Sequence, residues 1–130
     1  NTDGIDIGGQ NVLIERLNIT NFDDAVAVKA SVNTLEEAQC TQNITIRDCN
    51  MWYSVGMSIG SVQPSDDVSC VYDVKFQNHV FHHPLKAIYV KTNPGTTKSM
   101  VPGSGGRIQK ILYENIEIHR PIWWNIYIGP

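Results

Sequence analysis

The sequence predicts an all-β fold, a right-handed parallel β-helix of about four to five coils that spans residues 1–130 as a single domain segment. Three observations lead to this prediction. Four Asn-containing apolar segments share one plan and begin at residues 11, 43, 73 and 110, at intervals of 32, 30 and 37 residues, a period typical of stacked repeats. Apolar and polar residues alternate within each segment, as they do in strands. No repeat carries an amphipathic run of helix length, which favours a β-solenoid over a helical one.

Each repeat is predicted to hold two strands separated by a short polar break. The repeats occupy residues 11–29, 43–61, 73–92 and 110–129. Their first strands carry the inward-facing apolar residues, which are Val12, Ile14, Ile44, Ile46, Val74, Phe76, Ile111 and Tyr113. Because parallel strands stack about 4.8 Å apart, these residues should form apolar ladders along the coil axis. The Pro/Gly/Ser/Thr-rich stretch 93–106 explains the longer third interval and predicts a projecting loop.

Composition and charge narrow the classes of partner. Of the 130 residues, 42% are hydrophobic and 18% are charged, which is typical of a globular segment. The net charge is −3 and the lysines and arginines are scattered, so we predict no nucleic-acid partner. The apolar runs are far shorter than the ~20 residues that a membrane-spanning helix needs. If the protein is secreted, we expect its leader upstream of residue 1, because no segment here resembles a signal peptide.

Three cysteines allow at most one internal disulfide. Cys40 and Cys70 each lie shortly before a repeat begins, so stacked coils should place them about one rung apart, within the Cα range of a disulfide. We predict a Cys40–Cys70 bond and a buried free thiol at Cys49; the alternative is a cytosolic protein with all three reduced. The motif NIT occurs twice and predicts N-glycosylation of Asn18 and Asn43.

The same stacking brings acidic residues together. Asp3, Asp23 and Asp24 precede strands, and in the stacked register they line one face with Lys91. Clustered carboxylates raise one another's pKa values and share protons, which suits a general acid and a base acting on water. Aspartates before strands are also common turn residues, so spacing alone leaves a structural role open.

Four short segments carry a resemblance to a known family. The segments NTDG (1–4), DD (23–24), GMSIGS (56–61) and IYVKT (88–92) occur in the order, and at about the spacing, of the signature segments of glycoside hydrolase family 28, the polygalacturonase family. Those signatures read roughly NTD, DD, GHG followed by SIGS, and RIK. The resemblance covers essentially the whole chain and implies a right-handed parallel β-helix, the fold that the repeats predict independently.

The resemblance also implies residue roles. Asp23 corresponds to the general acid that protonates the glycosidic oxygen, and Asp3 and Asp24 to the residues that activate water on the opposite face. This arrangement inverts the anomeric centre and leaves roughly 6.5–9.5 Å between acid and base. Lys91 corresponds to the lysine that meets a substrate carboxylate. The resemblance implies a pectic polysaccharide as substrate, and neither a metal nor a cofactor.

Two positions depart from the polygalacturonase pattern. Val55 stands where the family has histidine, and Tyr89 stands where it has the arginine of RIK. Tyrosine cannot reproduce the charged fork of arginine, but it offers an aromatic face and a hydroxyl to a sugar. The rhamnogalacturonan hydrolases of the family look similar at both positions, although they usually carry Asp-Glu in place of Asp23-Asp24. We therefore expect rhamnogalacturonan or a substituted galacturonan, rather than plain homogalacturonan, as substrate.

Other conspicuous side chains are given more modest expectations. His83 lies in the turn before the fourth segment and is a candidate substrate contact; adjacent histidines point in different directions, so we predict no zinc site. Trp52 is expected in the core, and of the pair Trp123 and Trp124 we expect one ring inside and one outside.

The leading interpretation is a secreted, extracellular pectin-degrading hydrolase. The competing one is a catalytically inactive β-helix that binds carbohydrate or serves as a structural extracellular protein, for which Val55 and Tyr89 speak. A lyase is less favoured, because no arginine stacks beside the acids in this register. Since family members are usually several coils longer, we expect the chain to be a segment of a larger protein.

Overall fold

The computed structural model describes residues 2–33, 39–62, 68–93 and 105–130. Its strands in chain order are β1 (Ile5–Ile7), β2 (Gln10–Glu15), β3 (Asn18–Thr20), β4 (Asp24–Val28), β5 (Ser31–Asn33), β6 (Thr41–Trp52), β7 (Gly56–Val62), β8 (Val68–His82), β9 (Lys86–Thr92), β10 (Gly105–His119) and β11 (Trp124–Gly129). Within these ranges no helix has the length and apolar character needed to cross a membrane.

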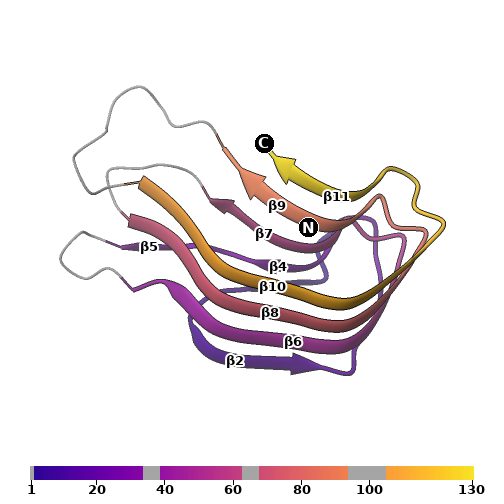
Figure 1. Cartoon of the computed structure of the whole chain (residues 1–130), viewed down its shortest axis with the longest axis horizontal. Helices are drawn as coiled ribbons and strands as arrows, with labels where there is room; N and C mark the ends of the chain where they lie inside the picture. The colour runs from indigo at the N-terminus through magenta and orange to yellow at the C-terminus, as the bar shows by residue number, and fades with distance from the viewer. Residues whose placement is uncertain (1, 34–38, 63–67, 94–104) are drawn as a thin grey trace.

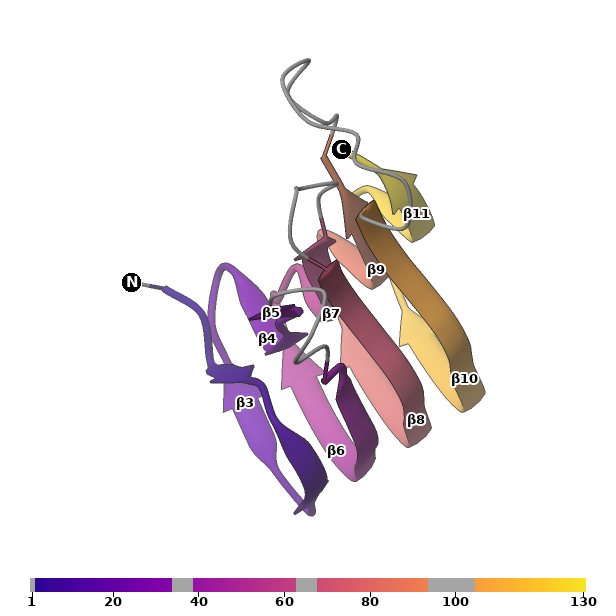
Figure 2. The ribbon, with the colours of Figure 1, turned by 90° about the vertical axis from the view of Figure 1, so that its left-hand side faces the viewer.

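The chain winds repeatedly between two sheets (Figure 1). The front sheet has the strand order β1-β4-β7-β9-β11, and the back sheet has the order β10-β8-β6-β2, with β3 also paired to β6. All of these pairings are parallel, whereas β5 joins β8 in the antiparallel sense. Figure 2 shows the coils lying side by side along the stack. This winding confirms the predicted parallel β-helix.

Alternation along the back-sheet strands builds the core. One ladder in register runs through Val12, Ile44, Val74 and Ile111, and the next through Ile14, Ile46, Phe76 and Tyr113. The rings of Phe76 and Tyr113 stack with centroids 4.3 Å apart. The front sheet closes the core with buried residues that include Val26, Val28, Met57 and Ile59. The predicted apolar ladders are therefore confirmed, and they leave the alternate positions of each strand pointing outward.

The back-sheet strands bend at residues in the left-handed backbone conformation. These form two rows, one of Asn11, Asn43, Asp73 and Lys110 and one of Arg16, Asp48, Asn78 and Asn115. Asparagine and aspartate adopt this conformation more readily than other side-chain-bearing residues. Hydrogen bonds between side-chain amides also connect the coils. Asn43 Nδ2 donates to Asn11 Oδ1 at 2.7 Å, and Asn115 Nδ2 donates to Asn78 Oδ1 at 3.0 Å. These bonds hold successive coils in register.

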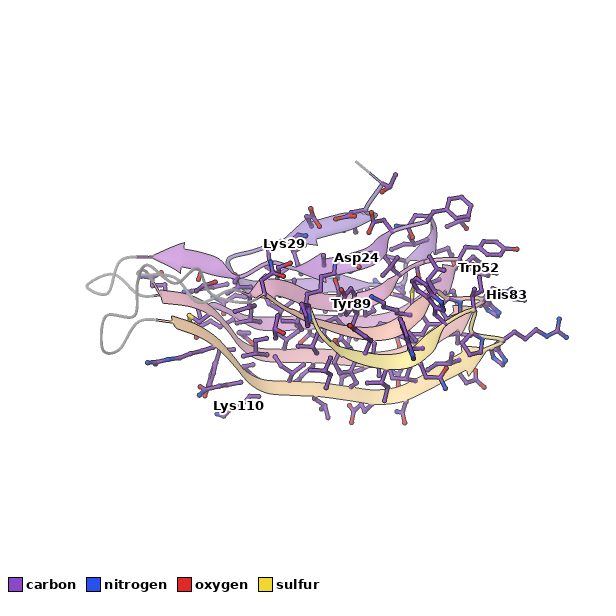
Figure 3. All side chains as sticks on the ribbon, turned by 90° about the horizontal axis from the view of Figure 1, so that it is seen from above. Asp24, Lys29, Trp52, His83, Tyr89 and Lys110 are labelled. Carbon is purple, nitrogen blue, oxygen red and sulfur yellow. A yellow bond between two sulfur atoms is a disulfide. The ribbon has the colours of Figure 1, made fainter. Side chains whose placement is uncertain are left out.

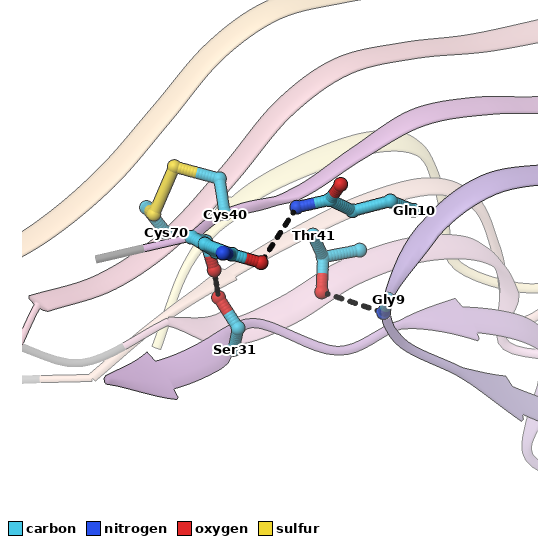
Figure 4. Close-up of a disulfide and its surroundings, with 7 residues drawn as sticks. Gly9, Gln10, Ser31, Cys40, Thr41 and Cys70 are labelled. Atoms are coloured by element: carbon cyan, nitrogen blue, oxygen red, sulfur yellow. Dashed lines mark hydrogen bonds between the residues drawn. A yellow bond between two sulfur atoms is a disulfide. The ribbon is translucent and has the colours of Figure 1, made fainter. Parts of the chain in front are cut away.

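The predicted Cys40–Cys70 disulfide is present and joins consecutive coils (Figure 4). Its Cα atoms are 4.8 Å apart, the distance of one rung. Close by, the backbone N–H of Gly9 donates to Thr41 Oγ1 at 3.2 Å and ties in the preceding coil. Cys49 is buried and free, as predicted. The disulfide therefore clamps two coils at the edge where β6 and β8 begin.

Two further sequence predictions meet the structure only in part. Most of the projecting loop predicted for 93–106 lies outside the described residues, and Gly105 and Gly106 already belong to β10. The predicted glycosylation sites Asn18 and Asn43 both have exposed side chains. Glycosylation itself stays a prediction at both.

One buried histidine makes the fold sensitive to acid. His79 is 1% exposed, and neither ring nitrogen has a hydrogen-bond partner among the described residues. Burial lowers the pKa of His79 from 6.5 to about 4. Between pH 6.5 and about pH 4, His79 binds a proton in the unfolded chain but not in the folded chain. The free energy of unfolding is therefore highest above about pH 6.5 and falls as the pH drops towards 4.

We expect protonation of His79 in the unfolded chain to lower the free energy of unfolding by about 3 kcal/mol at pH 4. Urea titrations at several pH values measure it. His79→Leu should flatten the acid side of the stability profile, and His119→Leu, which changes an exposed histidine, should not. Equal profiles for His79→Leu and the parent protein would contradict the prediction.

Candidate active site

The three predicted catalytic aspartates meet at one end of the front-sheet strands. Asp3 lies just before β1, Asp23 lies just before β4, and Asp24 is the first residue of β4. Since Ile5 pairs with Val26, Asp3 comes level with Asp24 on the neighbouring strand. One carboxylate oxygen of each aspartate lies within 4.8 Å of the other two. The parallel register thus assembles the cluster that the sequence predicts.

Hydrogen bonds orient Asp23. Thr2 Oγ1 donates to Asp23 Oδ2 at 2.7 Å, and the backbone N–H of Asp24 donates to Asp23 Oδ1 at 2.9 Å. Asn21 Nδ2 donates to the carbonyl oxygens of Thr2 at 3.1 Å and of Asp24 at 2.8 Å. The turn before β4 is therefore tied to the preceding coil, and both carboxylate oxygens of Asp23 accept a hydrogen bond.

Asp24 forms an ion pair with Lys91 across the front sheet. Asp24 is fully buried, and Lys91 Nζ on β9 contacts its Oδ2. The intervening strand β7 carries glycine at Gly56 and Gly60, where an added Cβ would meet the backbone of β9. The other oxygen of Asp24, Oδ1, is buried and has no hydrogen-bond partner among the described residues. A buried acceptor of this kind suits a ligand hydroxyl or a water molecule.

Lys29 is a second cation at the cluster, which the sequence analysis missed. Its Nζ lies 3.3 Å from Asp6 Oδ1 and 3.8 Å from Asp3 Oδ2. The strand period could have indicated this position. It places Lys29, the residue that follows β4, on the same outward face as Ala27. Figure 3 shows Lys29, Asp24 and Tyr89 on the same side of the molecule. The aspartates therefore have ammonium groups on both flanks.

The cluster drives the pKa values of two aspartates apart. Burial, the hydrogen bond with Asp6 and the negative charges of Asp23, Asp6 and Asp24 raise the pKa of Asp3 to about 6. The hydrogen bond from Thr2, the N–H of Asp24, a hydrogen bond with Asp3 and the charge of Lys91 lower the pKa of Asp23. Such splitting is how paired carboxylates divide acid and base roles. Without substrate and below about pH 6, Asp3 rather than Asp23 therefore holds the proton.

The nearest oxygens of the three carboxylates approach more closely than the acid-to-base separation that the sequence analysis expects. An inverting pair usually keeps its carboxyl groups roughly 6.5–9.5 Å apart, and a retaining pair roughly 5–5.5 Å. Here the three oxygens lie within 4.8 Å, because the aspartates stand on adjacent strands and beside one another in the chain. Strand spacing sets this closest approach, which is measured between single oxygens and not between whole carboxyl groups. Among the described residues, these three aspartates also lie close enough together to bind one metal cation. Lys29 and Lys91 already supply part of the positive charge that such a cation would bring.

Tyr89 takes an outward position in β9, but its ring does not lie open. The outward row in register runs through Asp6, Ala27, Ser58, Tyr89 and Tyr127. Lys86 Nζ lies 3.6 Å from the ring centroid of Tyr89, and Lys91 Nζ lies 5.0 Å from it. The expected stacking of a sugar on Tyr89 therefore competes with a lysine that the sequence analysis did not single out.

The other departure from the family pattern lies next to the acids. The backbone N–H of Val55 donates to the carbonyl oxygen of Asp23 at 2.7 Å. Val55 thus holds the position beside Asp23 through its backbone, and its side chain brings no proton-transferring group. Among the described residues, no histidine from elsewhere in the chain contacts Asp23 in place of the family histidine.

Aromatic side chains extend along the turn from Asp23. Phe22 stacks on Tyr53 at 6.0 Å, and Tyr53 stacks on His83 at 5.7 Å. Figure 3 shows His83 beside Trp52 at one end of the molecule, away from Asp24 and Tyr89. A substrate contact by His83 stays a prediction.

The tryptophan expectations are wrong. Trp52 is only partly buried, because it points outward and stacks on His82 at 4.9 Å. Trp123 and Trp124 are both exposed, by 62% and 47%. Trp124 begins β11 and Trp123 directly precedes it, and this strand has a neighbour on one side only among the described strands.

Comparison with known proteins agrees with this geometry. The chain is 30% identical over 118 residues to the Probable rhamnogalacturonase C of Aspergillus flavus, covering 91% of this chain and 22% of that protein. It is 34% identical over 119 residues to a polygalacturonase of Juniperus ashei (91% and 20%), and 29% identical over 108 residues to an α-L-rhamnosidase of Aspergillus niger (82% and 23%). No solved structure gives a significant match.

The chain spans about a fifth of the length of these relatives. The family model for glycosyl hydrolases family 28 matches residues 1–128, which include all three clustered aspartates and Lys91. This chain therefore belongs to glycosyl hydrolases family 28.

Proposed function

We propose that this chain forms part of a secreted pectin-degrading glycoside hydrolase that cleaves rhamnogalacturonan or a substituted galacturonan. The observation that carries the proposal is the meeting of Asp3, Asp23 and Asp24 within 4.8 Å, with Lys91 on the same face. Aspartates that serve only to end strands need no shared proton and no cation reaching them from two strands away. The disulfide supports an oxidising, extracellular location.

In the proposed mechanism, Asp23 protonates the glycosidic oxygen while Asp3 and Asp24 activate water for a single displacement with inversion. Below about pH 6, Asp3 carries the proton before substrate binds, because its pKa is raised to about 6 while the pKa of Asp23 is lowered. Asp3 and Asp23 are hydrogen-bonded, so the proton passes to Asp23 as the complex forms, and this transfer leaves Asp3 as a base.

The substrate preference rests on Tyr89 and on the relatives. Tyr89 lacks the charged fork that grips a uronate carboxylate from two sides. Two of the relatives are named for rhamnogalacturonan or rhamnose cleavage. A neutral aromatic residue at this position suits a backbone in which neutral sugars alternate with uronates.

Release of reducing sugar by the full-length protein tests the proposal. Homogalacturonan, xylogalacturonan and rhamnogalacturonan are compared from about pH 4 to about pH 8. We expect release to be fastest from rhamnogalacturonan or xylogalacturonan, and the rate to fall as the pH rises through about 6, because the cluster then loses its proton. The anomeric configuration of the first product, followed by NMR, tests inversion.

The second candidate is a catalytically inactive β-helix that binds carbohydrate. Val55 in place of histidine and the full burial of Asp24 behind Lys91 favour it. Binding of a pectic polymer without release of reducing sugar at any pH would establish this alternative and overturn the hydrolase.

A further inference from the structure

A lysine at the start of β9 is held by three aromatic rings. Lys86 Nζ lies 3.6 Å from the ring centroid of Tyr89, 4.4 Å from that of Tyr127 and 5.9 Å from that of Trp124. Tyr89 and Tyr127 are neighbours in register on β9 and β11, and Trp124 pairs with Lys86 itself. Cation–π contacts of this kind position an ammonium group without neutralising its charge.

In contrast to Lys29 and Lys91, Lys86 has no carboxylate partner in the part of the chain that the structure describes. Lys91 is paired with Asp24, and Lys29 is paired with Asp6 and Asp3. Across the described ranges, no carboxylate lies within 4.0 Å of Lys86 Nζ. An ordered cation that lacks a carboxylate partner beside a carbohydrate site is suited to an anionic group of the ligand.

Lys86 also stands where charge is missing from the family pattern. Lys86 and Lys91 approach the same phenol ring, at 3.6 and 5.0 Å from its centroid, and this ring belongs to Tyr89, the residue in place of arginine. Of these two ammonium groups, that of Lys91 is already engaged by Asp24. The free positive charge at this point is therefore that of Lys86.

We propose that Lys86 binds a carboxylate of the substrate and determines its specificity for uronate-containing chains. The proposal rests on the proposed hydrolase function and deepens it, since it assigns to Lys86 the charge that Tyr89 does not supply. Tyr89, Tyr127 and Trp124 act as positioning residues that hold the ammonium group in place before the ligand arrives, which reduces the entropy lost on binding.

The experiment separates charge recognition from structure. Full-length protein carrying Asp23→Asn, to prevent turnover, is titrated calorimetrically with a rhamnogalacturonan backbone oligosaccharide and with the same oligosaccharide after reduction of its carboxyl groups. In this background Lys86→Met, which keeps an unbranched side chain against the rings, should weaken binding of the acidic oligosaccharide about tenfold. Binding of the reduced oligosaccharide should change less than about twofold.

Two further variants complete the test. Lys86→Arg keeps the charge and should retain most of the affinity, which rules out a general folding defect. Lys110→Met is the matched control, because Lys110 Nζ lies 4.8 Å over Tyr72 in the back sheet and should not affect either titration. Figure 3 shows Lys110 well apart from Tyr89.

Four results would overturn the assignment. An equal loss for both oligosaccharides would assign Lys86 a structural role, and no loss for either would remove it from the site. If the Asp23→Asn protein binds neither oligosaccharide and the parent protein releases no sugar from any pectic polymer, the proposed function fails together with this inference. Release of sugar by the parent with unchanged binding in Lys86→Met overturns the inference alone.

Discussion

Replacing Asp23 with asparagine is expected to reduce the rate of glycoside cleavage by about a thousandfold, within the range seen when a general acid is removed. The amide cannot take the proton from Asp3 and pass it to the leaving oxygen. It also keeps only one of the two acceptor oxygens that bond to Thr2 and to the N–H of Asp24. We expect a loss of stability of only about 1 kcal/mol from that change. Initial rates on the best polymer of the panel measure the effect.

Asp73→Asn is the matched control for this variant. Asp73 lies in a left-handed row of the back sheet, where Asn11 and Asn43 occupy the two preceding rungs. The same chemical change should therefore leave both the rate and the fold intact there. A rate for Asp23→Asn within a few-fold of that of Asp73→Asn would remove Asp23 from the proposed mechanism.

Gly56→Ala is expected to lower the free energy of unfolding by about 3 kcal/mol or more. Gly56 has a φ of 102°, and a Cβ added there would lie 2.2 Å from the carbonyl oxygen of Ala87 and 2.5 Å from that of Lys86. Both obstacles are backbone atoms of β9. They can retreat only if β7 and β9 separate, which would also displace the strand that carries Lys91.

Gly9→Ala separates steric clash from backbone strain. Gly9 has nearly the same φ, 99°, but an added Cβ there meets nothing within 4 Å. We expect Gly9→Ala to cost about 1 kcal/mol from the strained conformation alone. Urea unfolding of both variants measures the difference, and equal losses would mean that β9 accommodates the extra methyl group.

The sequence predicts the fold and the acid cluster because both follow from spacing. Repeats at 32, 30 and 37 residues fix which residues become neighbours across coils, and alternation fixes which face each occupies. The same reasoning places Cys40 one rung from Cys70 and Asp3 level with Asp24. Period and register act over the whole chain, so no single local exception can displace them.

Features that depend on the reach of long side chains could not be predicted in this way. Strand period places Lys86 and Lys29 on a face, but it does not reveal that one ends over tyrosine rings and the other beside carboxylates. The pKa order of Asp3 and Asp23 depends on individual hydrogen bonds of the same kind. The antiparallel pairing of β5 with β8 could not be predicted either, because the repeat pattern assumes that every coil has the same strands as the one before it.

The two left-handed rows have a consequence for how such a protein can change its length. The two rows are separated by the same number of residues in every coil, as in Asn43 and Asp48 or Asp73 and Asn78. Side-chain hydrogen bonds join members of each row in neighbouring coils. An insertion of one residue between the rows would turn the side chains that follow it in that strand to the opposite face and break these bonds. An insertion after β7 or β9 would leave both rows aligned. Variation in length, and with it the evolution of new substrate preferences, is therefore channelled to the connections that follow the front-sheet strands.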